Sequence, residues 1–213
     1  MNDFLNALFV VVLTLNLFTL GNGRILSVIR IVSAQGVILG ILPLVMHEQP
    51  GFPAILSAIA AISLKGVIIP SIMGKALRDA QIKREVEPLI GLLPSTILGA
   101  LVTAIAFLVF SGARGAGEAQ ASLVIPTSIA TVLVGFILLT TRYKALSQVL
   151  GYLVLENGIY IFSLLLVEAI PLVVEMGMLL DLFVSVFIVS IITNHINRAF
   201  SSIDTRQLAS LKE

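Results

Sequence analysis

The sequence predicts an all-α, polytopic membrane protein with seven transmembrane helices. Of its 213 residues, 58% are apolar and 12% are charged, whereas soluble domains have about 45–50% and about 25%. The mean hydropathy is +1.08. Seven stretches are apolar over roughly the 20 residues that a helix needs to cross a bilayer core of about 30 Å. These observations exclude an ordinary soluble domain.

The predicted spans lie at 4–20, 25–46, 53–73, 88–110, 122–140, 145–167 and 170–193. The first has no basic residue before it and no small-x-small cleavage site, so we interpret it as a span and not as a signal peptide. In the second, Gly36 and Gly40 form a motif for close helix packing. We divide the chain into a four-helix segment, 1–116, and a three-helix segment with a cytoplasmic tail, 117–213.

The distribution of Lys and Arg predicts the topology. Ten of the 13 basic residues fall in loops or in the tail on one side, and only Arg114 falls on the other side. The remaining two, Arg30 and Lys65, lie within spans. Because cytoplasmic loops accumulate basic residues, we expect the N-terminus outside and the C-terminus in the cytoplasm.

Three ionisable residues on three spans share one depth. At 1.5 Å per residue, Glu156 lies about 16 Å from the inner edge of its span, and Asp181 and Lys65 reach a similar level. A charge at the bilayer centre costs about 2.5–3.5 kcal/mol on insertion scales. A purely structural role would hardly justify this cost for three residues. In a medium of low dielectric constant their neutral forms are favoured, and such groups can exchange protons. We therefore predict a proton relay of Glu156, Asp181 and Lys65.

Polar neighbours support this interpretation. Gln148, Tyr152, Glu156 and Tyr160 recur every four residues and share one face of a helix. The first three and the last three spans run in the same sense, and Gln35 falls near the place of Glu156, which is consistent with an old duplication.

The third span contains Pro70, which has no N–H, so the carbonyl of Gly66 loses its helical partner. We expect a broken helix there that lines a hydrated cavity beside Lys65. Arg30 and Glu175 are further accessory candidates, but snorkelling of Arg30 and an interfacial position of Glu175 explain both without a role in the relay.

Two alternatives to the relay remain open. Lys65 and one of the two acids could form a static ion pair that holds the helices together, although this leaves the second acid unexplained. The chain could also be a passive scaffold between larger membrane subunits, with its buried charges serving assembly alone.

Composition excludes several other classes. A chain without Cys forms no disulfide, thiolate zinc site or iron–sulfur cluster. It has no Trp, and its buried Lys65 lies on the third span, which argues against a retinal protein. His47 and His195 are predicted at opposite sides of the membrane, which excludes a haem between them. A net charge of +1 gives no support for nucleic-acid binding. We expect no catalytic, metal or cofactor-binding residue in this chain.

Several short motifs resemble known families. Residues 122–213, with Gly151–Gly158 around Glu156, Leu179–Asp181 and Ile203–Asp204, resemble the K subunit of respiratory complex I and the C subunit of multisubunit cation/proton antiporters. The whole chain, including the sequence Leu64–Pro70, resembles component E of hydrogenase-4 and formate-hydrogenlyase-like complexes.

The resemblance implies a non-catalytic membrane subunit of a nickel–iron hydrogenase-type assembly related to complex I, in the inner membrane of a prokaryote. Its partners would be antiporter-like and other membrane subunits, together with membrane lipid. Two glutamates are usual in the complex I K subunit, and here Asp181 would take the place of the second. A subunit of a multisubunit cation/proton antiporter is the alternative within the same resemblance.

Overall fold

The computed structural model describes residues 2–46, 51–79, 88–111 and 121–165. The expected span at 170–193, with Glu175 and Asp181, and the expected cytoplasmic tail lie outside the described residues.

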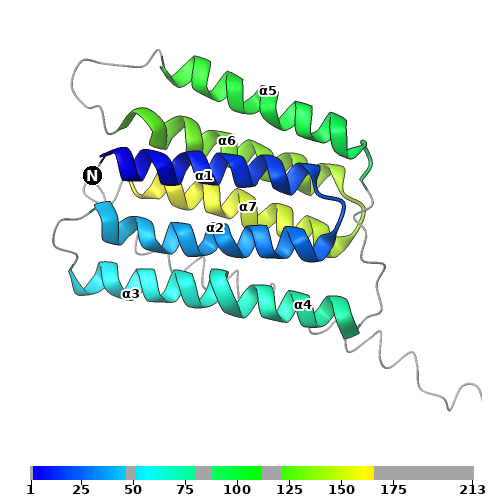
Figure 1. The fold of residues 1–213 in the computed structure, drawn as a ribbon, viewed down its shortest axis with the longest axis horizontal. Coiled ribbons are helices and arrows are strands. Elements are labelled where there is room, and N and C mark those ends of the chain that lie inside the picture. Colours follow the sequence, from blue (N-terminus) through cyan, green and yellow to red (C-terminus); the bar gives the residue numbers. More distant parts are fainter. Residues whose placement is uncertain (1, 47–50, 80–87, 112–120, 166–213) are drawn as a thin grey trace, which may run out of the picture.

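The described ranges form a bundle of helices with nearly parallel axes (Figure 1). Regular structure in these ranges is helical apart from isolated bridge residues at Arg24, Pro88 and Arg142, which confirms the all-α prediction for this part. α5 lies at one edge of the bundle and the α3–α4 helix at the opposite edge. The elements are α1 (Asn2–Gly21), α2 (Ile25–Met46), α3 (Phe52–Ala61), the π-helix η1 (Ile62–Ile68), α4 (Ile69–Asp79), α5 (Leu92–Ser111), α6 (Ala121–Thr141) and α7 (Ala145–Ser163).

Five helices in the described ranges are long and apolar enough to cross a membrane. α7 is not among these five candidates. The helix predicted at 145–167 is therefore present up to Ser163, while its crossing of the membrane remains a prediction. The five candidate spans are Asp3–Gly21, Ile25–Val45, Ala58–Lys75, Leu92–Phe110 and Leu123–Thr141.

The fourth predicted span starts later than expected. α5 begins at Leu92 and not at residue 88, because the segment before it pairs with the end of α6. The Leu89 N–H donates to the Thr141 carbonyl at 2.8 Å. Pro94 then occupies the first turn of α5, where a missing N–H costs no helical hydrogen bond.

The third predicted span is not broken at Pro70, contrary to expectation. α3, η1 and α4 follow one another without a gap from Phe52 to Asp79. In η1 the backbone takes wider π-type turns, and the Ile69 N–H donates to the Leu64 carbonyl five residues earlier. The Gly66 carbonyl accepts a hydrogen bond from the Ser33 hydroxyl of α2 at 2.5 Å, which replaces the partner that Pro70 removes.

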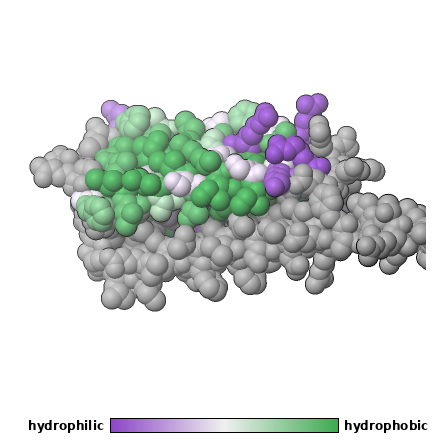
Figure 2. Space-filling view, turned by 90° about the horizontal axis from the view of Figure 1, so that it is seen from below, coloured by the Kyte–Doolittle hydropathy of each residue, from purple (hydrophilic) through white to green (hydrophobic). Residues whose placement is uncertain are grey.

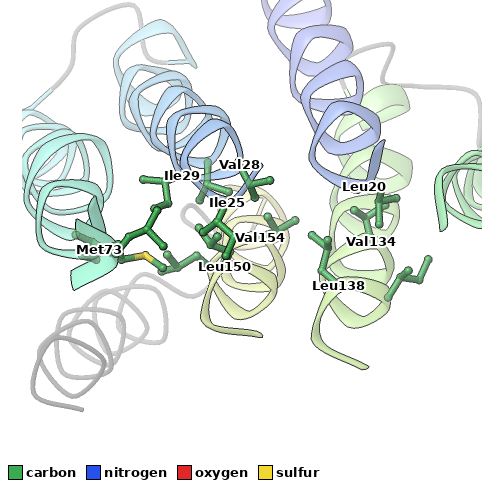
Figure 3. Packing of buried hydrophobic residues seen from close by; sticks show 14 residues of the cluster. Leu20, Ile25, Val28, Ile29, Met73, Val134, Leu138, Leu150 and Val154 are labelled. Atoms are coloured by element: carbon green, nitrogen blue, oxygen red, sulfur yellow. The ribbon is translucent and has the colours of Figure 1, made fainter. Parts of the chain in front are cut away.

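Two apolar clusters fill the bundle. The larger one joins α1, α2, α4, α6 and α7 and includes Leu20, Val28, Leu138 and Leu150 (Figure 3). α6 and α7 approach each other closely because glycines lie at their contact. A Cβ at Gly151 would lie 2.6 Å from the Leu139 nitrogen, and one at Gly158 would lie 2.6 Å from the Val132 nitrogen. Such contacts are too short for any larger side chain, so these glycines fix the position of α7.

The outer surface is largely apolar. On α5, Leu93 and Leu108 are 74% and 75% exposed. The face over α3 and α4 is broadly hydrophobic, and hydrophilic residues gather at the end where α4 terminates (Figure 2). Lys75 and Arg78 of α4 are exposed. A water-soluble monomer rarely exposes so much contiguous apolar surface, whereas lipid or partner helices cover it in a membrane.

Candidate functional site

Two of the three predicted relay residues lie in direct contact. The Lys65 amine of η1 lies 3.4 Å from the Glu156 carboxylate of α7, and both side chains are buried. Lys65 lies near the middle of the candidate span Ala58–Lys75, and Glu156 lies near the middle of α7. The pair therefore occupies the interior of the bundle at mid-height.

Tyr160 is the third member of this cluster. Its ring centroid lies 5.2 Å from the Lys65 amine, within the range of a cation–π contact. Glu156 and Tyr160 are both buried and lie one turn apart on α7. The amine is thus held between a carboxylate and an aromatic face.

Helix α2 brings Lys65 to this position through its glycines. A Cβ at Gly36 would lie 2.7 Å from the Lys65 Cβ, so only glycine lets α2 approach η1 this closely. Gly40 similarly lies against Ile62. The structure confirms Gly36 and Gly40 as a close-packing motif.

The other candidate residues lie away from the pair. Gln148 is exposed at the start of α7, where its amide donates to the Arg142 carbonyl at 3.0 Å. Tyr152 is half-buried and packs against the larger apolar cluster. Arg30 is exposed on α2. The polar face predicted for α7 therefore runs from the surface at Gln148 into the interior at Glu156 and Tyr160. Asp181 and Glu175 lie outside the described residues.

A second polar cluster, on α1, α2 and α6, was not predicted from the sequence. The Asn16 amide donates to the Thr131 hydroxyl at 2.9 Å, and the Gln35 amide donates to the Asn16 carbonyl oxygen at 2.8 Å. All three side chains are fully buried. The sequence signal was an amide side chain inside each of two apolar stretches, of which only Gln35 was considered.

Arg142 was also missed, because its place after the fifth apolar stretch indicated a cytoplasmic loop. The structure buries its side chain to 2% exposure, and one guanidinium N–H donates to the Leu20 carbonyl at 2.9 Å. Burial lowers the pKa of Arg142 from its ordinary value, because removal from water disfavours the charged guanidinium. This arginine contributes to the interior of the bundle and not to a solvated loop.

Chemically, the Lys65–Glu156 cluster provides one base and one acid with little contact to water. A proton can reside on the amine, giving an ion pair, or on the carboxylate, giving two neutral groups. In a medium of low dielectric constant these two states differ strongly in the field that they exert on neighbouring groups. The Asn16–Gln35–Thr131 cluster contains only amides and a hydroxyl, which do not ionise in the physiological pH range. No group of three potential metal ligands occurs among the residues that the structure describes.

The fold and this site define a helical membrane protein with a buried acid–base pair. Among known proteins, the chain is similar to the uncharacterised protein Rv0085 of Mycobacterium tuberculosis, with 29% identity over 189 residues that cover 88% of this chain and 86% of that protein. It is also similar to hydrogenase-4 component E of Escherichia coli and of Shigella flexneri. Both share 25% identity over 153 residues, which cover 72% of this chain and 71% of each relative.

No protein-family model matches the chain. No solved structure matches it either.

Proposed function

We propose that the chain is a non-catalytic membrane subunit of a hydrogenase-type complex, and that its Lys65–Glu156 pair takes part in proton translocation. The observation that carries the proposal is the contact of 3.4 Å between a buried amine and a buried carboxylate at mid-height of the bundle. Intramembrane ionisable residues are costly and typically belong to ion or proton pathways. Asp181, on the seventh predicted span, extends the relay beyond the described residues.

Similarity supports membership of such a complex. The relatives from Escherichia coli and Shigella flexneri are named as components of hydrogenase-4, and they match this chain over most of its length. The apolar outer surface and the five candidate spans are consistent with a subunit embedded in a membrane. Electrons would flow through other subunits, because this chain contains no Cys for an iron–sulfur cluster.

We place the protein in the inner membrane of a prokaryote, with seven spans, the N-terminus outside and the C-terminus in the cytoplasm. Antiporter-like and other membrane subunits of the assembly, together with lipid, would cover its apolar surface. Purification of the chain in mild detergent, followed by identification of the proteins that accompany it, tests this proposal. Recovery of a stable and active monomer contradicts it.

The passive scaffold is the second candidate, and the same ion pair favours it. A buried pair stabilises a bundle only as long as both charges are present, and loss of one partner leaves an uncompensated charge. The two candidates therefore differ in what happens when the charges are removed together.

The decisive experiment compares Glu156→Gln and Lys65→Met with the double variant in the whole complex, reconstituted in vesicles. The amide and the thioether retain most of the side-chain volume and remove the titratable protons. If the pair relays protons, all three variants assemble and proton translocation falls in each, while electron transfer to an artificial acceptor persists. Proton translocation in the double variant is then about as low as in the more impaired single variant, because both residues act in the same proton path. Asp181→Asn should behave in the same way.

Asp3→Asn serves as the matched control, because it changes an exposed carboxylate at the outer end of α1 into an amide. Proton translocation in this variant should equal that of the wild type. A double variant that assembles and translocates protons at the normal rate contradicts the relay and favours the scaffold.

A further inference from the structure

A small cavity lies at the end of the bundle where α6 ends and α7 begins. Side chains of four helices line it: Thr19, Val28, Leu138, Arg142, Ser147 and Leu150. Figure 3 shows Val28, Leu138 and Leu150 between the ribbons of α2, α6 and α7. The space open to the centre of a water-sized sphere is about 10 Å³. This volume is enough for one monatomic ion or one water molecule.

Two polar side chains that line this cavity are buried and have hydrogen-bond donors without an acceptor. Arg142 is 2% exposed, and its Nε and Nη1 groups have no hydrogen-bond partner; Ser147 is 4% exposed, and its hydroxyl has none either. Of the carboxylates in the described ranges, none forms an ion pair with Arg142. A buried guanidinium without a counter-charge is costly, so a negatively charged ligand beside it would be strongly stabilised.

Helix ends of both signs meet at this place, because the cavity is also lined by Thr19 in the last turn of α1 and by Leu138 in the last turn of α6, where the helix C-terminus carries a partial negative charge. Ser147 is in the first turn of α7, and Val28 is in the first turn of α2. The N-terminus of a helix carries a partial positive charge and favours anions. Neither helix has an acidic residue in its first turn, and no side chain caps the start of α7. The Arg142 guanidinium and the Ser147 hydroxyl therefore supply the unpartnered donors of the cavity, and no carboxylate of the described residues lines it.

We propose that this cavity is a binding site for a small monovalent anion of the size of chloride, held by the Arg142 guanidinium and the Ser147 hydroxyl. The anion would accept charge-assisted hydrogen bonds from Arg142 and one from Ser147. A phosphate headgroup is too large for this space, and a carboxylate would need room for two oxygens and a carbon. The site is independent of the Lys65–Glu156 pair and of the proposed proton relay.

The test uses the full chain in detergent and follows thermal unfolding by circular dichroism as chloride replaces gluconate at constant ionic strength. Ligand binding to the folded state alone raises the midpoint of unfolding with concentration. We expect chloride to raise it saturably by about 2–4 °C, whereas gluconate is too large to enter. Arg142→Gln should abolish the shift, and Arg24→Gln, which removes an exposed arginine beside the start of α2, should retain it.

If Arg142→Gln does not fold, Ser147→Ala still tests the site, because it removes one donor and leaves the arginine in place. We expect it to raise the chloride concentration at half-saturation by about tenfold. A direct test replaces chloride by bromide in crystals, where an anomalous peak should lie within hydrogen-bond distance of Arg142 and Ser147. An equal response to chloride and gluconate, an unchanged response in Ser147→Ala, or a cavity that holds only water overturns the proposal.

Discussion

Gly36 of α2 lies directly against Lys65 of η1. A Cβ at position 36 would lie 2.7 Å from the Lys65 Cβ and 2.9 Å from its carbonyl carbon. Because the second atom belongs to the backbone, a simple change of side-chain rotamer cannot relieve the clash. The distance between Lys65 and Glu156 therefore depends on a residue that has no side chain.

Gly36→Ala should destabilise the protein by about 1–3 kcal/mol, because a methyl group forced into a packed contact moves the backbone. The free energy of unfolding, measured by denaturant titration in mixed micelles, checks this expectation. Gly74→Ala is the matched control: its Cβ would meet nothing within 4 Å, in the neighbouring helix α4. It should leave stability unchanged or raise it by about 0.4–1 kcal/mol. Equal effects of the two substitutions would contradict the role assigned to Gly36.

Ser33→Ala should destabilise the π-helix around Lys65, because it removes the hydrogen bond to the Gly66 carbonyl. Interhelical hydrogen bonds in membrane proteins contribute about 0.6–1.7 kcal/mol. Ser95→Ala is the control, since the Ser95 hydroxyl is buried without a hydrogen-bond partner and its removal should cost little. The same unfolding titration gives both values.

A second experiment tests why Ser33→Ala lowers stability. Pro70→Ala supplies an N–H that can donate to the Gly66 carbonyl within the helix. In that background Ser33→Ala should cost less than in the wild type. If the cost is unchanged, the Ser33 hydroxyl does not act as the substitute for the missing proline N–H.

The sequence predicted most of the helices, because apolar length and breaks at glycine or charged residues are local signals. α2 begins and ends where its apolar stretch does, and α1, α6 and the start of α7 agree within a few residues. The exceptions have non-local causes. α5 starts later because Leu89 pairs with Thr141 of another helix, and Pro70 does not break its helix because Ser33 of α2 supplies a donor.

For the candidate site, depth along each span was sufficient to select Lys65 and Glu156, since position along a helix follows from residue count. The partners of a residue across helices do not follow from residue count. The contact of Lys65 with Tyr160, the bond between Asn16 and Thr131 and the burial of Arg142 all depend on how helices distant in sequence pack together. These three features therefore required the structure.

The topology makes a prediction about the loops. Since ten of the 13 basic residues are assigned to the inner side, reporter fusions near position 80 and after position 200 should both read as cytoplasmic, and a fusion near 116 should read as external. Paired phosphatase and fluorescent-protein reporters show on which side of the membrane each position lies. If positions 80 and 116 lie on the same side, the seven-span arrangement is wrong.

Asn16 and Thr131 should be energetically coupled, although 115 positions separate them in the sequence. Their hydrogen bond of 2.9 Å joins α1 to α6, and Thr131 in turn donates to the Thr127 carbonyl at 2.7 Å. Asn16 also accepts from Gln35 of α2, so three helices meet at this amide. Its removal leaves buried partners unsatisfied, which costs about 1–3 kcal/mol in addition to the lost bond.

The measurement is a double-mutant cycle with Asn16→Ala and Thr131→Val, followed by the free energy of unfolding in mixed micelles. We expect a coupling energy of about 0.5–1.7 kcal/mol between the two positions. Thr103→Val provides the control cycle with Asn16→Ala, because the Thr103 hydroxyl donates only within α5, to the Gly99 carbonyl at 2.7 Å. That pair should be additive within about 0.3–0.5 kcal/mol. Additivity of the Asn16 and Thr131 substitutions would show that α1 and α6 are held together by apolar packing alone.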